Sequence, residues 1–451
     1  MKLNLNTGFA RTAVFLIALT LVLAGCHTAV QPDIGSTPAT NDSITQLVFG
    51  AAQQIGGPAS NAASPLLVQG QDGHLYMIWS QDDPQSAAAA NVSGNTSGTS
   101  MGSSALRDVL MSISSNGGQT WSKPLQVNDK PAAIEADENP PKIAVASNGW
   151  IYSVWNFPNA KGDKMRGNAQ FASFNGVGGF TPAQTLNDVK DVARFAALGI
   201  SPDGTIFIPW IDRRVDNPAP RRIYHTRISA SGKVLSTNVN IGGPACECCR
   251  LAMAFADGGK TVYIAYRENL NNIRDMVIQK STDGGNTFGA PVVISNEGWY
   301  VESCPHSGPD IAVDAAGDVH VTWWTPGPKP EDAGIYYSVS QDGGQTFSPR
   351  KLIDAENGTG ALRSYLSVGP GGNIYMAWSN IVPNADNTTQ IFFRYLGSDG
   401  KTLSSVQQLS KSKGNADRPA VIVSNGKVYI SWTETDGENS SAFLTMAPIL
   451  K

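Results

Sequence analysis

The chain has 451 residues, with 33 Lys and Arg against 37 Asp and Glu, and its formal net charge at pH 7 is -4. Such a balance leaves no basic face for a nucleic-acid partner, which the composition therefore argues against. With 46 glycines, 10 tryptophans and only 16% charged residues, the composition is typical of a turn-rich β protein with an ample core.

The first 26 residues predict export and a lipid anchor. Lys2 and Arg11 precede the apolar run TAVFLIALTLVLAG, which ends at Cys26, and this order is typical of a signal peptide. The closing LAGC resembles the bacterial lipobox, in which the cysteine takes up lipid and becomes the new N-terminus. An ordinary signal peptide with a chance cysteine is the alternative.

Residues 27–43 are polar, contain two prolines and have no periodicity, so we expect a flexible tether between residues 1–26 and a folded body at 44–451. No later segment has the 18 or more apolar residues that a membrane span needs. We therefore expect a protein of the bacterial cell envelope that faces the periplasm or the cell exterior. Its only contact with the membrane would be the lipid on Cys26.

The folded body is built from a repeat. Seven segments have an apolar strand, a glycine-bearing turn and a second strand that usually ends in Trp, which is the pattern of a β-hairpin. The turn glycines are Gly73, Gly149, Gly204, Gly259, Gly317, Gly372 and Gly426. Five of the six intervals between them are 54 to 58 residues, and the first is 76 residues. A period of this size indicates a repeat architecture.

The hairpins are followed by a third strand and a fourth strand, such as RDMVIQKS and APVVIS. Four strands in each repeat predict an all-β fold, a β-propeller of four-stranded antiparallel blades. We count seven blades, with six as the alternative. The last repeat has only three strands, and ITQLVFG at 44–50 is predicted to supply its fourth strand and close the ring.

Three octapeptides lie between third and fourth strands: SSNGGQTW at 114–121, STDGGNTF at 281–288 and SQDGGQTF at 340–347. They resemble the Asp-box, or BNR repeat, of sialidase-like propellers, in which Asp or Asn caps a turn and Gly supplies a positive φ. The resemblance covers the folded body and implies the propeller fold, whereas the boxes occur in proteins of many functions. Blade topology places them on the face opposite the expected site.

The opposite face receives the connections between blades, and these bring four cysteines together. Cys246, Cys248 and Cys249 precede the fourth blade, and Cys304 precedes the fifth. Two disulfides are the interpretation we favour, because an exported protein meets an oxidising compartment. A thiolate metal site that includes His306 is the second interpretation, although the C-x-C-C spacing lacks the usual two-residue gap. A redox or nucleophilic thiol is the third.

Arginines recur where innermost strands begin, and we expect them to converge near the axis of the ring. They are Arg194, Arg250, Arg363 and Arg418. Clustered guanidiniums are suited to bidentate capture of a carboxylate, sulfate or phosphate. The alternative is that each pairs with a carboxylate from a neighbouring blade. The carboxylates in question are Asp137, Glu138, Asp191 and Asp417.

The sialidase resemblance implies a catalytic set. A sialidase uses a Tyr nucleophile activated by a Glu, together with an Asp acid. The segment RSYLSVGPGGNIYMAW is similar to the family's late-blade segment, which makes Tyr365 the candidate nucleophile. Glu302 or Glu247 would then activate Tyr365, and Asp137 would be the acid. The alternative is that Tyr365 is a packed core ring.

Three functions follow from these patterns. The first is a sialidase-like hydrolase or lectin-like module that recognises, with or without cleavage, a terminal acidic sugar or another anionic small ligand. The second is a non-catalytic scaffold of the envelope, because the family's hydrolases usually have six blades and an early Arg-Ile-Pro motif that the first blade lacks. The third is a metal or redox protein built on the cysteines. We expect a monomer, and no cofactor outside the thiolate alternative.

Overall fold

A computed structural model describes the fold. The residues that it describes are 46–57, 60–85, 106–130, 139–158, 167–214, 221–327, 329–356, 362–382, 387–437 and 439–449. Cys26, the tether, Asp137 and Glu138 lie outside the described residues. Among the described residues, no helix is both long and apolar enough to cross a lipid bilayer.

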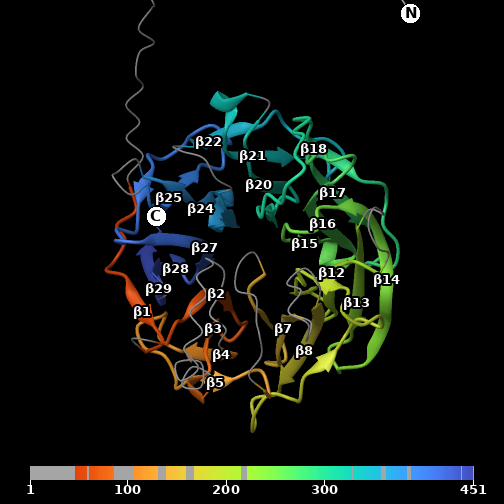
Figure 1. Cartoon of the computed structure of the whole chain (residues 1–451), viewed down its shortest axis with the longest axis vertical. Coiled ribbons are helices and arrows are strands. Elements are labelled where there is room, and N and C mark those ends of the chain that lie inside the picture. The colour runs from red at the N-terminus through yellow and green to blue at the C-terminus, as the bar shows by residue number, and fades with distance from the viewer. Residues whose placement is uncertain are drawn as a thin grey trace, which may run out of the picture. The chain divides into compact units, whose positions relative to one another are not determined.

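The chain forms seven antiparallel sheets that are arranged as a ring around a central axis (Figure 1). This confirms the predicted seven-bladed propeller. The first blade consists of β2 (Ala63–Gln69), β3 (Leu75–Asp82), β4 (Arg107–Ser114) and β5 (Leu125–Gln126). The second consists of β6 (Lys142–Val145), β7 (Ile151–Pro158), β8 (Gly167–Phe174) and β9 (Gln184–Thr185). The third consists of β10 (Ala193–Arg194), β11 (Gly199–Ile200), β12 (Ile206–Asp212), β13 (Arg221–Ile228) and β14 (Val234–Ala245). Because β10 and β11 both pair with β12, they share the innermost position of the third blade.

The other four blades continue the pattern. The fourth blade consists of β15 (Ala252–Ala256), β16 (Thr261–Arg267), β17 (Met276–Ser281) and β18 (Val292–Ser295), and the fifth of β19 (Asp310–Val313), β20 (Val319–Thr325), β21 (Gly334–Ser340) and β22 (Lys351–Ala355). The sixth consists of β23 (Ser364–Val368), β24 (Ile374–Ile381), β25 (Thr389–Leu396) and β26 (Gln407–Gln408). The seventh consists of β27 (Asn415–Ser424), β28 (Lys427–Asp436), β29 (Asn439–Pro448) and β1 (Gln53–Ile55). Three short 3-10 helices are η1 (Asp257–Gly259), η2 (Pro330–Asp332) and η3 (Pro370–Gly372).

The ring closes through the N-terminal part of the chain, a few residues later than predicted. Strand β1 pairs with β29, whereas residues 46–50 form no strand. They run beside β29 all the same, because the Gly50 N–H donates to the Met446 carbonyl at 2.9 Å and Leu47 is buried. The apolar pattern of this segment serves packing rather than strand pairing, and the paired residues QQI are too polar to stand out in the sequence.

Packing between blades supplies the core. Large rings from second strands lie in it with less than 2% of their surface exposed; they are Trp79, Trp210, Trp323, Trp378 and Trp432. These tryptophans end the hairpin pattern that the sequence repeats. Since aromatic side chains bury the largest apolar areas, they contribute strongly to holding neighbouring blades together.

The three octapeptides that resemble Asp-boxes fold as the same turn. In the second one, Asp283 accepts from the Thr287 N–H at 2.9 Å and from the Ser281 hydroxyl at 2.7 Å. These bonds, those from Thr287 above all, lower the pKa of Asp283 to about 2. Asn116 accepts from the Thr120 N–H in the first turn at 2.9 Å, so an amide replaces the carboxylate without change of geometry.

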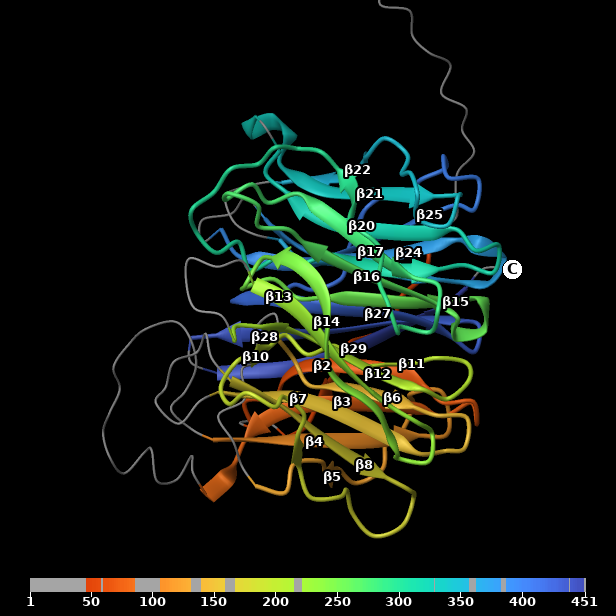
Figure 2. The ribbon, with the colours of Figure 1, turned by 90° about the vertical axis from the view of Figure 1, so that its right-hand side faces the viewer.

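The side view shows strands of successive blades running across the ring from one face to the other (Figure 2). Turns between third and fourth strands therefore lie on one face. Connections from each fourth strand to the next innermost strand lie on the other face, which we call the loop face. It is the face that presents the cysteines and the arginines of the sequence analysis.

Candidate functional site

At the loop face, the starts of the innermost strands of blades four to seven carry charged and aromatic side chains. We call this group the rim cluster; its members are Arg250, Asp310, Arg363, Tyr365, Asp417 and Arg418. Arg250 precedes β15, and Asp310 is the first residue of β19. The others belong to β23 and β27 or immediately precede β23. The connection between blades thus places each member at the same end of its strand.

Arg250 links blade four to blade six. It is only 4% exposed, and its Nη2 donates to the Ser364 carbonyl at 2.6 Å. Its guanidinium carbon lies 4.1 Å from the centroid of the Tyr365 ring, a cation–π contact. Gly308 packs so close to the Arg250 backbone that a Cβ would come within 2.3 Å of the Arg250 carbonyl oxygen. The segment before blade five therefore requires a glycine at position 308, because a side chain there would collide with the Arg250 backbone.

Asp310 is a carboxylate whose pKa is affected by the charge of Arg250. Its Oδ2 accepts from the Leu366 N–H at 2.9 Å. Burial raises the pKa of Asp310 above its ordinary value, although the charges of Arg250 and of Lys142 in blade two lower it. Asp310 is thus a carboxyl group that costs free energy to ionise and relies on cations from two other blades.

Arg363 and Asp417 form an ion pair between blades six and seven. Burial alone would raise the pKa of Asp417, but the guanidiniums of Arg363 and Arg418 outweigh it and lower that pKa. Arg418 has a φ of 55°, and the pairing of β27 with β28 is irregular between Asp417 and Ala420. Such an irregularity re-aims side chains. The predicted alternative, a guanidinium paired with Asp417, therefore applies to Arg363.

Arg194 lies apart from this group. Its Nη1 contacts the Glu247 carbonyl oxygen at 3.5 Å, and its guanidinium lies over the ring of Phe195 at 4.6 Å. The Glu247 carboxylate accepts from Arg221 Nε at 2.7 Å and lies 4.0 Å from Arg213. Both arginines belong to blade three or follow its second strand. Glu247 is therefore engaged there and does not hydrogen-bond to Tyr365.

The catalytic set that the resemblance implies stays a prediction, although Glu247 and Glu302 hydrogen-bond to residues other than Tyr365. The Glu302 carboxylate accepts from the hydroxyl of Tyr300 in its own exposed loop, and Asp137 lies outside the described residues. Tyr365 is partly buried, and its ring packs against the core between blades six and seven. The packed-ring alternative thus describes its surroundings, to which Arg250 adds a charge on the ring face.

Two residues of the site were missed in the sequence. Asp310 and Lys142 occupy equivalent repeat positions, immediately before the I-A-V of PDIAV and PKIAV. A lysine and an aspartate at the same repeat position of blades two and five could have been recognised in the sequence. Because innermost strands begin around one axis, such positions can act on each other across the ring.

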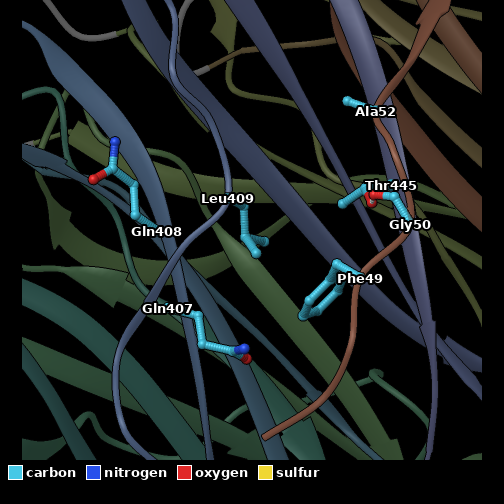
Figure 3. A pocket seen from close by; sticks show the side chains of 7 residues that line it. All are labelled: Phe49, Gly50, Ala52, Gln407, Gln408, Leu409 and Thr445. Carbon is cyan, nitrogen blue, oxygen red and sulfur yellow. Dashed lines mark hydrogen bonds between the residues drawn. The ribbon is translucent and has the colours of Figure 1, made fainter.

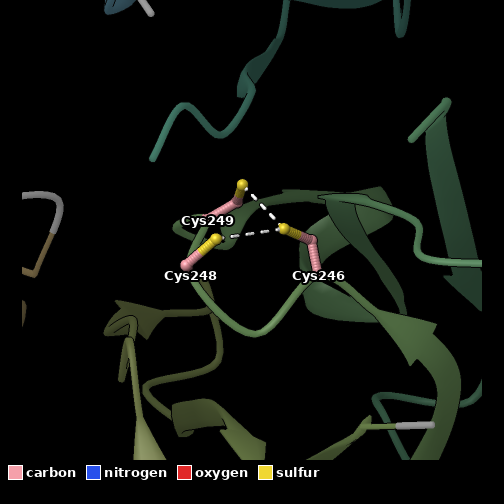
Figure 4. A group of neighbouring side chains, drawn as sticks. All are labelled: Cys246, Cys248 and Cys249. Atoms are coloured by element: carbon pink, nitrogen blue, oxygen red, sulfur yellow. Dashed lines mark hydrogen bonds between the residues drawn. The ribbon is translucent and has the colours of Figure 1, made fainter. Parts of the chain in front are cut away.

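The structure brings together the four cysteines as predicted. Cys246, Cys248 and Cys249 are buried, and the Cys246 Sγ lies 2.9 Å from the Cys249 Sγ and 3.5 Å from the Cys248 Sγ (Figure 4). Cys304 is exposed, and its contact with Cys248 lowers the pKa of the Cys304 thiol. The disulfide pairing stays a prediction.

A cavity of about 220 Å³ lies elsewhere, between the closing segment and blade six (Figure 3). Its lining residues are Phe49, Gly50, Ala52, Gln407, Gln408, Leu409 and Thr445. None of them carries an ionisable side chain. The cavity therefore belongs to ring closure rather than to the rim cluster.

Comparisons with known proteins agree with the fold. No protein-family model matches the sequence, and no curated protein matches it. Among solved structures, polysaccharide lyase Uly1 has a TM-score of 0.54 at 12% identity over 88% of this chain and 92% of that chain. A PL25 ulvan lyase bound to -[GlcA(1-4)Rha3S]- has a TM-score of 0.53 at 10% identity over 86% and 95%. The endosialidase of phage phi92 has a TM-score of 0.51 at 13% identity over 90% and 70%. At these identities the likeness is one of fold.

Proposed function

We propose that this chain is a carbohydrate-binding propeller that holds an acidic glycan at the rim cluster. The observation that carries the proposal is local charge. Arg250, Arg363 and Arg418 lie at the same end of the innermost strands of blades four, six and seven, and the Arg250 guanidinium lies over the Tyr365 ring. The chain as a whole has a net charge of -4, so this clustering of arginines is a local feature.

Guanidinium groups suit this ligand because their planar donors match a carboxylate or sulfate in a bidentate manner. The named structures of similar fold support the same class of ligand. Two are polysaccharide lyases, one of them bound to a ligand with glucuronate and sulfated rhamnose units, and the third is an endosialidase. Terminal sialic acid belongs to this class, and for it Tyr365 is the nucleophile that the sialidase resemblance implies. Because Glu302 and Glu247 bond elsewhere, we propose binding rather than cleavage.

The glutamine variant of Arg418 should weaken glycan binding. Calorimetric titration with uronate-containing, sulfated and sialylated oligosaccharides should find a ligand whose affinity falls with added salt. The Arg418→Gln variant should bind it at least about tenfold more weakly, since it loses a charge-assisted hydrogen bond. Arg227→Gln is the matched control, because Arg227 contacts Gly284 and Asn286 in a turn on the opposite face.

If Arg418→Gln and Arg227→Gln bound the oligosaccharide with equal affinity, the binding site would lie outside the rim cluster. A protein that binds none of these oligosaccharides but retains a protein partner from the envelope would be a scaffold. Release of free sugar from a bound oligosaccharide would add hydrolysis to the proposal.

We also propose that lipid on Cys26 holds the protein at the envelope, as the LAGC motif implies. Cells supplied with labelled palmitate should incorporate the label into the wild-type protein and not into the Cys26→Ser variant. Unlabelled wild-type protein would contradict the lipid anchor.

A further inference from the structure

Four thiols and one imidazole from two blades meet at the loop face. The Sγ atoms of Cys246, Cys248 and Cys249 all lie within 4.8 Å of one another, and so do the ligand atoms of Cys248, Cys304 and His306. Cys248 belongs to both triplets. The first triplet lies in the turn before β15, and the other two side chains lie in the segment before β19. The topology thus gathers five soft or borderline donors into two triplets that share Cys248.

The sulfur separations suit ligands that share an ion. A disulfide bond is about 2.05 Å long, whereas the two contacts of Cys246 are 2.9 and 3.5 Å. A zinc–thiolate distance of about 2.3 Å lets one ion reach sulfurs as far as about 4.6 Å apart. The 3.5 Å contact with Cys248 is close to the roughly 3.8 Å between sulfurs of a tetrahedral zinc site, and the 2.9 Å contact with Cys249 would lengthen when an ion binds (Figure 4).

Two buried arginines near the thiols would be stabilised by a nearby negative charge. Arg267 is 1% exposed, and its guanidinium donates to backbone carbonyls alone: those of Ser307, Arg274 and Trp324. Arg274 is 5% exposed, and its Nη1 is buried without a hydrogen bond. The Cys246 N–H donates to the Arg267 carbonyl at 2.8 Å, so Arg267 and the first triplet are neighbours.

Asp275 feels the charge of Arg267, but it accepts its hydrogen bonds from the N–H groups of Glu297 and Gly298. A buried guanidinium keeps its proton and is costly without a counter-charge. Two disulfides would be neutral and would supply none. Four thiolates around one divalent ion would carry a net charge of two negative, which the two arginines balance.

We propose that these five side chains form a binding site for a thiophilic metal ion, Zn²⁺ or Cu⁺, with Cys248 as the ligand common to both triplets. Thiolate sulfur selects such ions over the hard cations Mg²⁺ and Ca²⁺. The three buried thiolates form the inner part of the site. Cys304 and His306 form the part nearer solvent, through which the ion enters. A bound ion fastens blade four to blade five next to Arg250.

The test begins with protein purified under anaerobic conditions without chelators and studied by native and denaturing mass spectrometry. The reduced, metal-free protein is then titrated with Zn²⁺ and with Cu⁺ against chromophoric competitors. We expect binding of at least one of the two ions tighter than about 0.1 μM. The ion that binds, and the number of ions bound, distinguish one zinc site from a copper site at each triplet.

Cys304→Ser should fold, because Cys304 is exposed, and should weaken binding at least about 100-fold, more than the loss of an outer-shell partner does. His74→Asn is the control, since His74 lies in the β2–β3 turn on the opposite face and pairs with Asp72. Metal binding should also raise the melting temperature of the wild-type protein.

Three results would overturn the proposal. One is a purified protein that is four hydrogens lighter than the reduced chain and holds no metal, which would show two disulfides. Another is a reduced protein that binds neither ion more tightly than about 1 μM. The last is equal affinity in Cys304→Ser and His74→Asn.

Discussion

Replacing Arg250 with Met should lower the free energy of unfolding by about 1.5–3 kcal/mol at pH 7, the range for losing a hydrogen bond to a charged group. The Ser364 carbonyl loses its donor, the Tyr365 ring loses the cation above it, and Asp310 loses a charge that offsets its burial. Urea denaturation followed by tryptophan fluorescence measures the change.

The pH dependence of the stability loss in Arg250→Met tests whether Asp310 contributes to it. A carboxyl whose pKa is raised in the folded state binds its proton more tightly there than in the unfolded chain, so its contribution to stability falls as pH rises above the ordinary value of 3.8. Arg250→Met raises that pKa further, so its loss of stability should be smaller at pH 5 than at pH 7. Adding Asp310→Asn should recover part of the stability and remove this pH dependence. The same loss at both pH values, with no recovery in the double variant, would contradict the coupling.

Leu47→Ala should cost about 2–5 kcal/mol of stability, the range for removing most of a buried leucine side chain. Leu47 is 3% exposed and packs with Tyr375, Ile391 and Ala447 of blades six and seven. The neighbouring Val48 is 78% exposed, so Val48→Ala should change stability by less than about 0.5 kcal/mol. Thermal unfolding of both variants gives the comparison. Equal stabilities would mean that the closing segment contributes little to the ring.

The ring itself could be predicted because its signals are local. Turn glycines, paired apolar strands and terminal tryptophans recur at one spacing, and each blade needs only its own 50 to 60 residues to show them. The convergence of Cys246 and Cys304 was predictable for the same reason, since topology alone sends every connection between blades to one face. The closing strand Gln53–Ile55 escaped notice because its pairing uses backbone groups, which any side chain allows.

The partners of individual charges could not be predicted in this way. Arg250 donates to the carbonyl of Ser364, which lies 114 positions further along the chain and two blades away. Glu247, expected near Tyr365, pairs with Arg221 instead. Such choices depend on side-chain reach and on the exact course of loops, and neither leaves a periodic trace in the sequence.

Hydrogen–deuterium exchange with and without a bound acidic oligosaccharide tests the proposed location of binding most directly. We expect slower exchange in segments 246–252, 310–313, 362–366 and 415–420, which carry the rim cluster and its neighbours. The turns at 281–288 and 340–347 on the opposite face should exchange as before. Protection confined to those turns, or no protection anywhere at saturating ligand, would contradict glycan binding at the rim.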